Sequence, residues 1–115
     1  LHYAETLVSE KNQSFVSAYQ EAYGDMPDAY AVHGYDTGAM LIQALDAVEG
    51  NTTDREALIA ALAAVELQSP RGPLRFSKSH HPIQNIYLRE IRNGRHEVLS
   101  VAHELLESPD ADCQM

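Results

Sequence analysis

The sequence predicts an α/β fold in which a helix–strand–helix–helix segment is followed by a C-terminal β-hairpin region. Aromatic residues at positions 15, 19 and 23 recur every four residues, which is the spacing of one helical face. The dipeptide Asn93-Gly94 separates two stretches rich in β-forming residues, which is a strong hairpin signal. A chain of 115 residues is one domain or a piece of one. Because one short strand between helices cannot complete a sheet, we predict an incomplete part of a larger α/β fold.

The first half of the chain is predicted to contain two helices and one buried strand. The first helix covers 12–23 and ends at Gly24, since glycine adopts a positive φ without strain. The short apolar run 29–33 is predicted as a strand. A second helix begins at residue 35 or 36 and continues to about residue 48, with Asp36 as its N-cap or first-turn acid. Its predicted inner face consists of Ala39, Ile42, Leu45 and Val48.

The second half is predicted to contain one helix and three strands. Thr53 and Glu56 have the spacing of a capping box, which opens a helix over 54–65. The predicted inner face of this helix consists of Leu58, Ala61, Leu62 and Val65. Strands are predicted at 74–77, 83–92 and 95–101, and the last two form the hairpin. Residues 103–115 are predicted to be a polar tail.

Composition excludes several classes of function. Eight Lys and Arg residues against 17 Asp and Glu residues give a net charge of −9, whereas a nucleic-acid binder needs a basic surface. The same charge argues against docking on anionic lipid. We expect no direct membrane insertion, because no apolar run approaches the roughly 20 residues that a bilayer crossing needs. The single cysteine, Cys113, excludes an internal disulfide and a cysteine-based zinc site.

Motifs for catalysis, metals and cofactors are weak. His80 and His81 are adjacent, so their side chains point in different directions and are poorly placed to hold one ion. No serine is flanked by glycines as in a nucleophile elbow. The segment 69–72 lacks the glycine spacing and the lysine of a phosphate-binding loop. We therefore predict that the protein is not an enzyme and has no metal or cofactor.

The predicted junction between strand and helix, residues 32–38, is the best candidate for a ligand site. In open α/β sheets, ligands bind beyond the carboxyl ends of the strands. Tyr35 could offer a stacking face and a hydroxyl, and Asp36 could accept a hydrogen bond from an ammonium or hydroxyl group. The alternative is structural, with Tyr35 in the core and Asp36 as a helix cap.

Several segments, taken in order, resemble one protein family. They include Phe15-Val16-Ser17-Ala18-Tyr19, Tyr30-Ala31-Val32-His33-Gly34-Tyr35-Asp36, Ser69-Pro70-Arg71-Gly72-Pro73-Leu74-Arg75-Phe76 and His81-Pro82-Ile83-Gln84-Asn85-Ile86-Tyr87-Leu88-Arg89. This order is similar to the late region of type I periplasmic solute-binding proteins, above all the branched-chain amino-acid (Leu/Ile/Val-type) members that serve ABC importers. The resemblance covers roughly residues 3–94.

The resemblance implies a two-lobed periplasmic-binding-protein type I fold, of which this chain would be the C-terminal third. Residues 1–72 would complete the N-terminal lobe, and residues 73–102 would return toward the second lobe. In such proteins the ligand lies between the lobes, which close around it by a hinge motion. The cleft-facing position implied for the junction makes His33, Tyr35 and Asp36 the candidate ligand-binding residues.

The implied function is that of an extracytoplasmic solute-binding component of an ABC importer. Its ligand would be an amino acid, an amide or an aromatic acid, its partner the membrane permease, and its location the periplasm. A fragment of this kind would expose helical faces, which favours self-association. The alternative is a cytoplasmic ligand-sensing effector domain of a regulator with the same fold, which a helix-turn-helix upstream would reveal.

Overall fold

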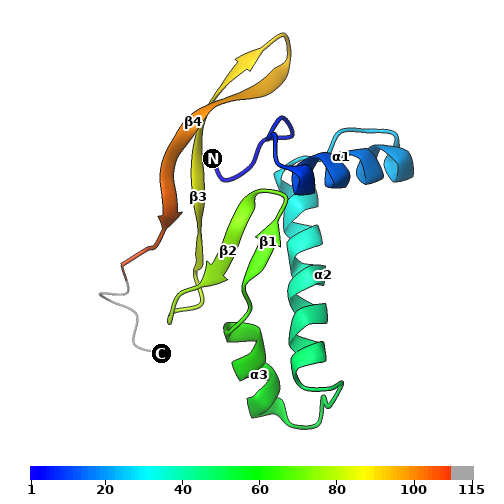
Figure 1. Ribbon diagram of the computed structural model, residues 1–115, viewed down its shortest axis with the longest axis vertical. Coiled ribbons are helices and arrows are strands. Elements are labelled where there is room, and N and C mark those ends of the chain that lie inside the picture. Colours follow the sequence, from blue (N-terminus) through cyan, green and yellow to red (C-terminus); the bar gives the residue numbers. More distant parts are fainter. Residues whose placement is uncertain (110–115) are drawn as a thin grey trace.

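The computed structural model describes residues 1–109, and these residues form three helices followed by a four-stranded antiparallel sheet (Figure 1). The α/β class predicted from the sequence is therefore confirmed. The elements are α1 (Glu10–Tyr23), α2 (Ala29–Ala47), α3 (Arg55–Ala63), β1 (Leu67–Ser69), β2 (Gly72–Phe76), β3 (Pro82–Arg92) and β4 (Arg95–Leu106). Residues 110–115, which include Cys113 and the end of the predicted tail, lie outside the described residues.

Helix α1 agrees with the sequence prediction. The side chain of Ser9 accepts a hydrogen bond from the Asn12 backbone and caps the N-terminus. Gly24 has a φ of 72° and ends the helix as predicted. Phe15 is buried, and the Tyr19 ring lies between those of Phe15 and Tyr23, with centroid distances of 6.0 and 4.6 Å. The predicted aromatic face therefore exists, although Tyr23 itself is exposed.

The predicted strand at 29–33 is wrong, because these residues form the first turns of α2. The carboxylate of Asp28 accepts hydrogen bonds from the backbone N–H groups of Tyr30 and Ala31, at 2.9 and 2.8 Å. This cap satisfies amides that a strand would have paired with a neighbour, so the apolar run continues into the helix. Asp36 consequently lies inside α2, and its predicted role as an N-cap is wrong.

The packed face of α2 agrees with the prediction only in part, since Ala39 packs against the core cluster as predicted. Ala44 is buried, whereas Ile42 is 64% exposed. The buried cluster contains Ala44, Val65, Leu67 and Leu74. The earlier start of the helix, at Ala29, does not explain this difference, because it leaves unchanged which residues share a helical face. The error arose because the apolar residues of α2 surround the helix and do not define a single stripe.

Helix α3 packs as predicted but is capped by a different residue. The side chain of Asp54 accepts from the Ala57 backbone at 3.0 Å, whereas the Thr53 hydroxyl bonds to Asn51. The predicted capping box does not form, because Asp54 is the N-cap and the residue three positions later, Ala57, has no side-chain acceptor to return a bond. Leu58, Ala61 and Leu62 pack against the cluster around Ala44, and Val65 belongs to it, so the predicted inner face is confirmed.

The four strands follow each other in the order β1-β2-β3-β4, and all neighbours are antiparallel. Positive φ angles at Asn93 and Gly94 confirm the predicted hairpin turn. Strand β1, which pairs Leu67 with Leu74, was not predicted. Strand β4 continues beyond the predicted end at residue 101, since His103 pairs with Ile86 and Leu106 with Gln84. The predicted start of the tail at residue 103 is therefore wrong, because backbone pairing with β3 extends the strand.

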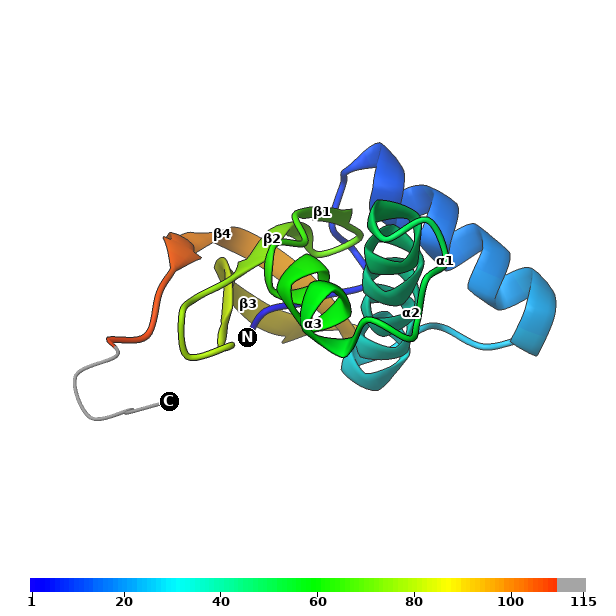
Figure 2. The ribbon, with the colours of Figure 1, turned by 90° about the horizontal axis from the view of Figure 1, so that it is seen from below.

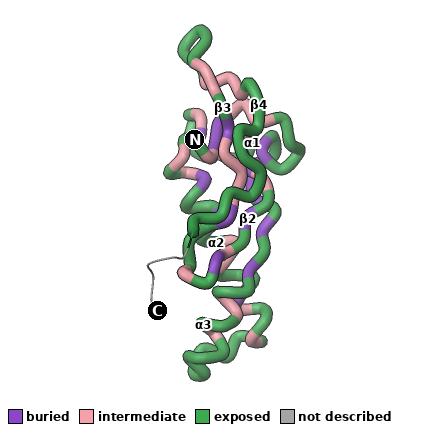
Figure 3. The backbone as a smooth tube through the Cα atoms, turned by 90° about the vertical axis from the view of Figure 1, so that its left-hand side faces the viewer, coloured by how far each residue is buried: buried purple, intermediate pink, exposed green. Residues whose placement is uncertain are grey.

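The β3–β4 hairpin projects away from the helices, and the molecule is elongated, with extents of 50 × 37 × 19 Å (Figures 1 and 2). The first residues of the chain lie beside β3, where the Leu1 carbonyl accepts from the Tyr87 backbone at 2.7 Å. Burial is concentrated where the helices meet the base of the sheet, whereas α3 and the far part of the hairpin are largely exposed (Figure 3). The base of the hairpin is therefore where the two parts of the molecule join.

Candidate functional site

The three predicted site residues do not converge on one point. One α-helical residue turns the chain by about 100°, so positions three apart share a face. His33 and Asp36 accordingly line one pocket, together with Arg71 from the turn after β1. Tyr35 points away from His33, toward α1, and shares a different, smaller pocket with Asp36. The structure thus brings His33 and Asp36 together and separates Tyr35 from the pocket they line.

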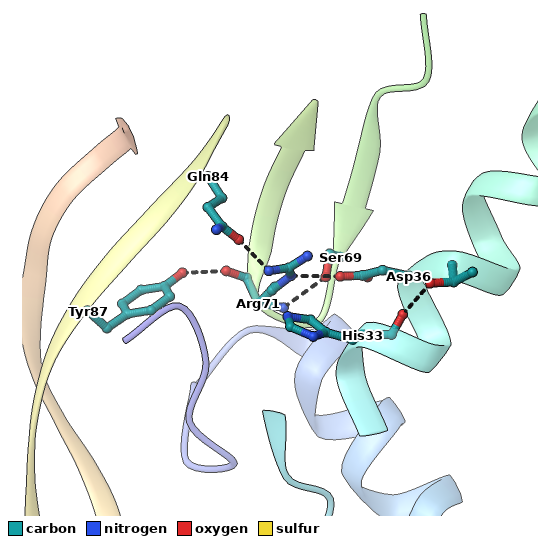
Figure 4. A network of polar contacts seen from close by, with 7 residues as sticks. His33, Asp36, Ser69, Arg71, Gln84 and Tyr87 are labelled. Carbon is teal, nitrogen blue, oxygen red and sulfur yellow. Dashed lines mark hydrogen bonds and ion pairs between the residues drawn. The ribbon is translucent and has the colours of Figure 1, made fainter. Parts of the chain in front are cut away.

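An ion pair between Asp36 and Arg71 stands at the centre of this site (Figure 4). Arg71 Nε lies 2.7 Å from Asp36 Oδ2, and the two side chains are only 7% and 6% exposed. Arg71 Nη1 donates to Gln84 Oε1 on β3. The Tyr87 hydroxyl donates to the Arg71 carbonyl at 2.7 Å. Arg71 therefore connects the helix α2 to strand β3 through both its side chain and its backbone.

The pocket beside this ion pair has a volume of about 280 Å³ and is mostly apolar. Its polar residues are His33, Asp36, Thr37 and Arg71, and its apolar wall consists of Met40, Leu67, Leu74, Phe76 and Pro82. Asp36 Oδ1 is buried and has no hydrogen-bond partner among the described residues. A buried acceptor of this kind can receive a hydrogen bond from a hydroxyl, amide or ammonium group. An apolar pocket with a few convergent polar groups is the usual form of a small-molecule site.

A second histidine lies beside His33. The rings of His2 and His33 are stacked, with centroids 4.7 Å apart and planes inclined by 10°. Burial, together with the nearby positive charge of Arg71, lowers the pKa of His2 from 6.5 to about 4. His2 is therefore neutral near pH 7, and it adds a neutral imidazole, and no charge, to this part of the molecule.

Tyr35 belongs to an aromatic cluster between α1 and α2. Its ring centroid is 5.1 Å from that of Phe15, and Lys11 Nζ lies 5.6 Å from the ring centre. The pocket on this side has a volume of about 640 Å³ and includes Tyr19 and Tyr23. Tyr35 is 37% exposed, so it covers Phe15 from solvent and is itself not fully buried.

Arg71 and Gln84 belong to the site although no local pattern indicates it. Arg71 is 35 positions from Asp36, and no spacing rule connects residues at that separation. Both residues lie in segments that carry the family resemblance, which implies no binding role for either of them. Within residues 1–109, no three His, Cys, Asp or Glu side chains gather in a way that would hold a metal ion.

Comparison with known proteins supports the interpretation of the fold. The helices and the antiparallel sheet are shared with solved structures of solute-binding proteins, of which they cover about a third. The sequence profile of the periplasmic binding protein family matches residues 1–95, and the chain belongs to this family. The family resemblance predicted from the sequence is thereby confirmed.

Relatives of known sequence and of known structure agree with this family assignment. The chain is 33% identical over 93 residues to the Leu/Ile/Val-binding protein homolog 6 of Brucella abortus, covering 78% of this chain and 24% of that protein. An ABC-transporter solute-binding protein of R. palustris, solved in complex with benzoate, has 39% identity and a TM-score of 0.94. The match covers all of this chain and 32% of that one.

A solute-binding protein from Rhodopseudomonas palustris BisB5, solved in complex with 3,4-dihydroxybenzoic acid, is also similar. Its identity is 30% and its TM-score 0.82, and the match covers 96% of this chain and 31% of that one. The chain thus spans between about a quarter and a third of the length of these relatives. Among residues 1–109, no helix combines the length and the apolar character that a membrane crossing requires.

Proposed function

We propose that this chain is the C-terminal part of the solute-binding component of an ABC importer. The observation that carries the proposal is the TM-score of 0.94 over the whole chain to a benzoate-binding member of this class. The membrane permease would be its partner and the periplasm its location. Residues 1–72 would then complete one lobe and residues 73–102 would lead into the other, with the solute between the two lobes.

The pocket at His33, Asp36 and Arg71 is the part of this chain best suited to contact a solute. Its apolar wall fits an aromatic ring or a branched side chain, and the His33 side chain at its edge can form a hydrogen bond to a polar group. We therefore infer that the solute is an amino acid, an amide or an aromatic acid. Tyr35 would contact a solute in the groove beside α1 or in the smaller pocket that it shares with Asp36.

The deciding experiment is a thermal-shift screen of the chain, and of the protein extended to the length of its relatives. A ligand that binds only the folded state raises the melting temperature with its concentration. His33→Phe should reduce the shift, because this exposed residue lines the pocket. Asp46→Ala, at the exposed end of the same helix, is the matched control and should leave the shift unchanged. The proposed solute classes are wrong if none of these compounds raises the melting temperature.

A cytoplasmic ligand-sensing domain with the same fold remains the competing function. The two proposals differ in what precedes residue 1 in the gene. A secretion signal supports the importer component, whereas a helix-turn-helix segment supports the regulator. Self-association of the chain through its exposed helical residues, such as Ile42 and Ile59, is a separate proposal. Light scattering at high concentration tests it, and a strictly monomeric chain would exclude it.

A further inference from the structure

Besides its backbone pairing with β2, the β3–β4 hairpin is held to the helices by two further connections. The first is the N-terminal segment, which follows the hairpin outward. The Leu1 carbonyl accepts from the Tyr87 backbone, Arg89 Nη1 donates to the Tyr3 carbonyl, and the Thr6 hydroxyl donates to the His96 carbonyl. This segment is also held by the helices, because Tyr3 is buried against Phe15 and Val32. It therefore restrains the outer part of the hairpin.

The second connection is the turn between β1 and β2, which holds the base of the hairpin through side-chain and backbone hydrogen bonds. Arg71 Nε binds Asp36 on α2, and Arg71 Nη1 binds Gln84 on β3 (Figure 4). The Tyr87 hydroxyl binds the Arg71 carbonyl from the same strand. A Cβ atom at the next residue, Gly72, would lie 2.9 Å from that hydroxyl, and Gly72 has a φ of 103°. The turn is therefore pressed directly against β3.

We propose that Arg71 is the positioning residue that fixes the angle between α2 and the β3–β4 hairpin. Its guanidinium is planar and holds its donors in a rigid fork, so it fixes the direction of both partners at once. The ion pair is buried, so solvent does not screen it and the fork has little freedom to reorient. Lysine, with one rotatable ammonium group, cannot reproduce this geometry.

This inference does not depend on the chain being a solute-binding protein. If that proposed function is correct, Arg71 lies where the chain passes from one lobe toward the other, and it would favour one angle between the lobes. A ligand closes such a protein by binding one angle better than another. The orientation of the hairpin can nevertheless be measured without any solute.

The test measures the distance between α2 and the hairpin by double electron–electron resonance. Spin labels are attached at Asp46→Cys on α2 and Ile91→Cys on β3, both exposed, in the full chain with Cys113→Ser. Gln84→Met removes the side-chain link from Arg71 to β3 and leaves the Tyr87 bond and the buried ion pair in place. We expect the distance distribution to broaden and its maximum to shift. Arg75→Met, an exposed arginine on β2, is the control and should keep the parent distribution.

Arg71→Lys and Arg71→Met complete the series. Both should broaden the distribution at temperatures where circular dichroism shows intact secondary structure, which separates orientation from stability. If the Arg71 variants do not fold, the Gln84→Met result decides alone. Unchanged distances in Gln84→Met would overturn the proposal, because the N-terminal segment and the pairing of β2 with β3 would then suffice to set the angle.

Discussion

Removal of the Asp36 charge should destabilise the fold more than any other single change at this site. In Asp36→Leu the Arg71 guanidinium, only 7% exposed in the parent, would remain buried without a counter-charge. At the observed separation of 2.7 Å, and with an effective dielectric constant of about 20, the attraction lost is about 6 kcal/mol. Part of it is offset, because the carboxylate no longer has to be desolvated. We therefore expect a loss of about 3–5 kcal/mol in the free energy of unfolding.

Urea unfolding followed by circular dichroism measures this loss. The double variant Asp36→Leu/Arg71→Met shows whether the loss comes from the unpaired Arg71 charge. With both charges replaced by apolar groups, the free energy of unfolding should return to within about 1 kcal/mol of the parent or exceed it. Arg75→Met, which removes an exposed arginine on β2, should change it by less than about 0.5 kcal/mol. A loss below about 1 kcal/mol in Asp36→Leu would refute the reasoning, since it would mean that water reaches the pair.

Three further changes test other contacts. Because the pKa of His2 is lowered from 6.5 to about 4 in the folded state, the unfolded chain binds more protons between these values. The free energy of unfolding should therefore fall as the pH drops from about 6.5 to about 4, and His2→Gln should flatten this dependence in urea titrations at each pH. Asn12→Ala should lower the free energy of unfolding, measured with urea, by about 3 kcal/mol. The reason is that the fully buried Asn12 accepts a hydrogen bond from the Tyr3 hydroxyl and donates to two backbone carbonyls. A decrease of less than about 1 kcal/mol would contradict this. Gly72→Ala should lower the free energy of unfolding by about 1–3 kcal/mol, since its φ is strained for alanine and its Cβ would meet the Tyr87 hydroxyl; an unchanged melting temperature would show that the turn relaxes freely.

Elements with a local stop signal could be predicted from the sequence. Gly24 ends α1 with a left-handed φ, and Asn93-Gly94 turns the hairpin, because these residues adopt such angles at little cost. The first turns of α2 could not be predicted in this way. The apolar run at 29–33 fits a strand or a buried helix equally well by periodicity. The N-cap formed by Asp28 favours the helix for this run.

The candidate site was only half predictable, for a related reason. His33 and Asp36 were chosen as neighbours of a strand end, yet they lie together because they are three residues apart on a helix. The same geometry sends Tyr35 to the other face. Their partner Arg71 lies beyond α3 and β1 in the chain, so only tertiary folding brings it to Asp36. Long-range pairs of single residues leave no local pattern in one sequence.

Asp36 belongs to both proposals, because Oδ2 binds Arg71 and Oδ1 faces no partner. A variant of Asp36 would therefore change the pocket and the connection to the hairpin together, and it cannot distinguish them. Variants of Gln84 and of His33 can distinguish the two proposals. Gln84 is hydrogen-bonded to Arg71 and does not line the pocket, whereas His33 lines the pocket and forms no hydrogen bond with Arg71. If His33→Phe abolishes a ligand-induced thermal shift while the spin-label distances stay unchanged, the pocket binds solute independently of hairpin orientation. If Gln84→Met also alters the thermal shift, the two are coupled, because ligand binding then depends on the angle that Arg71 holds.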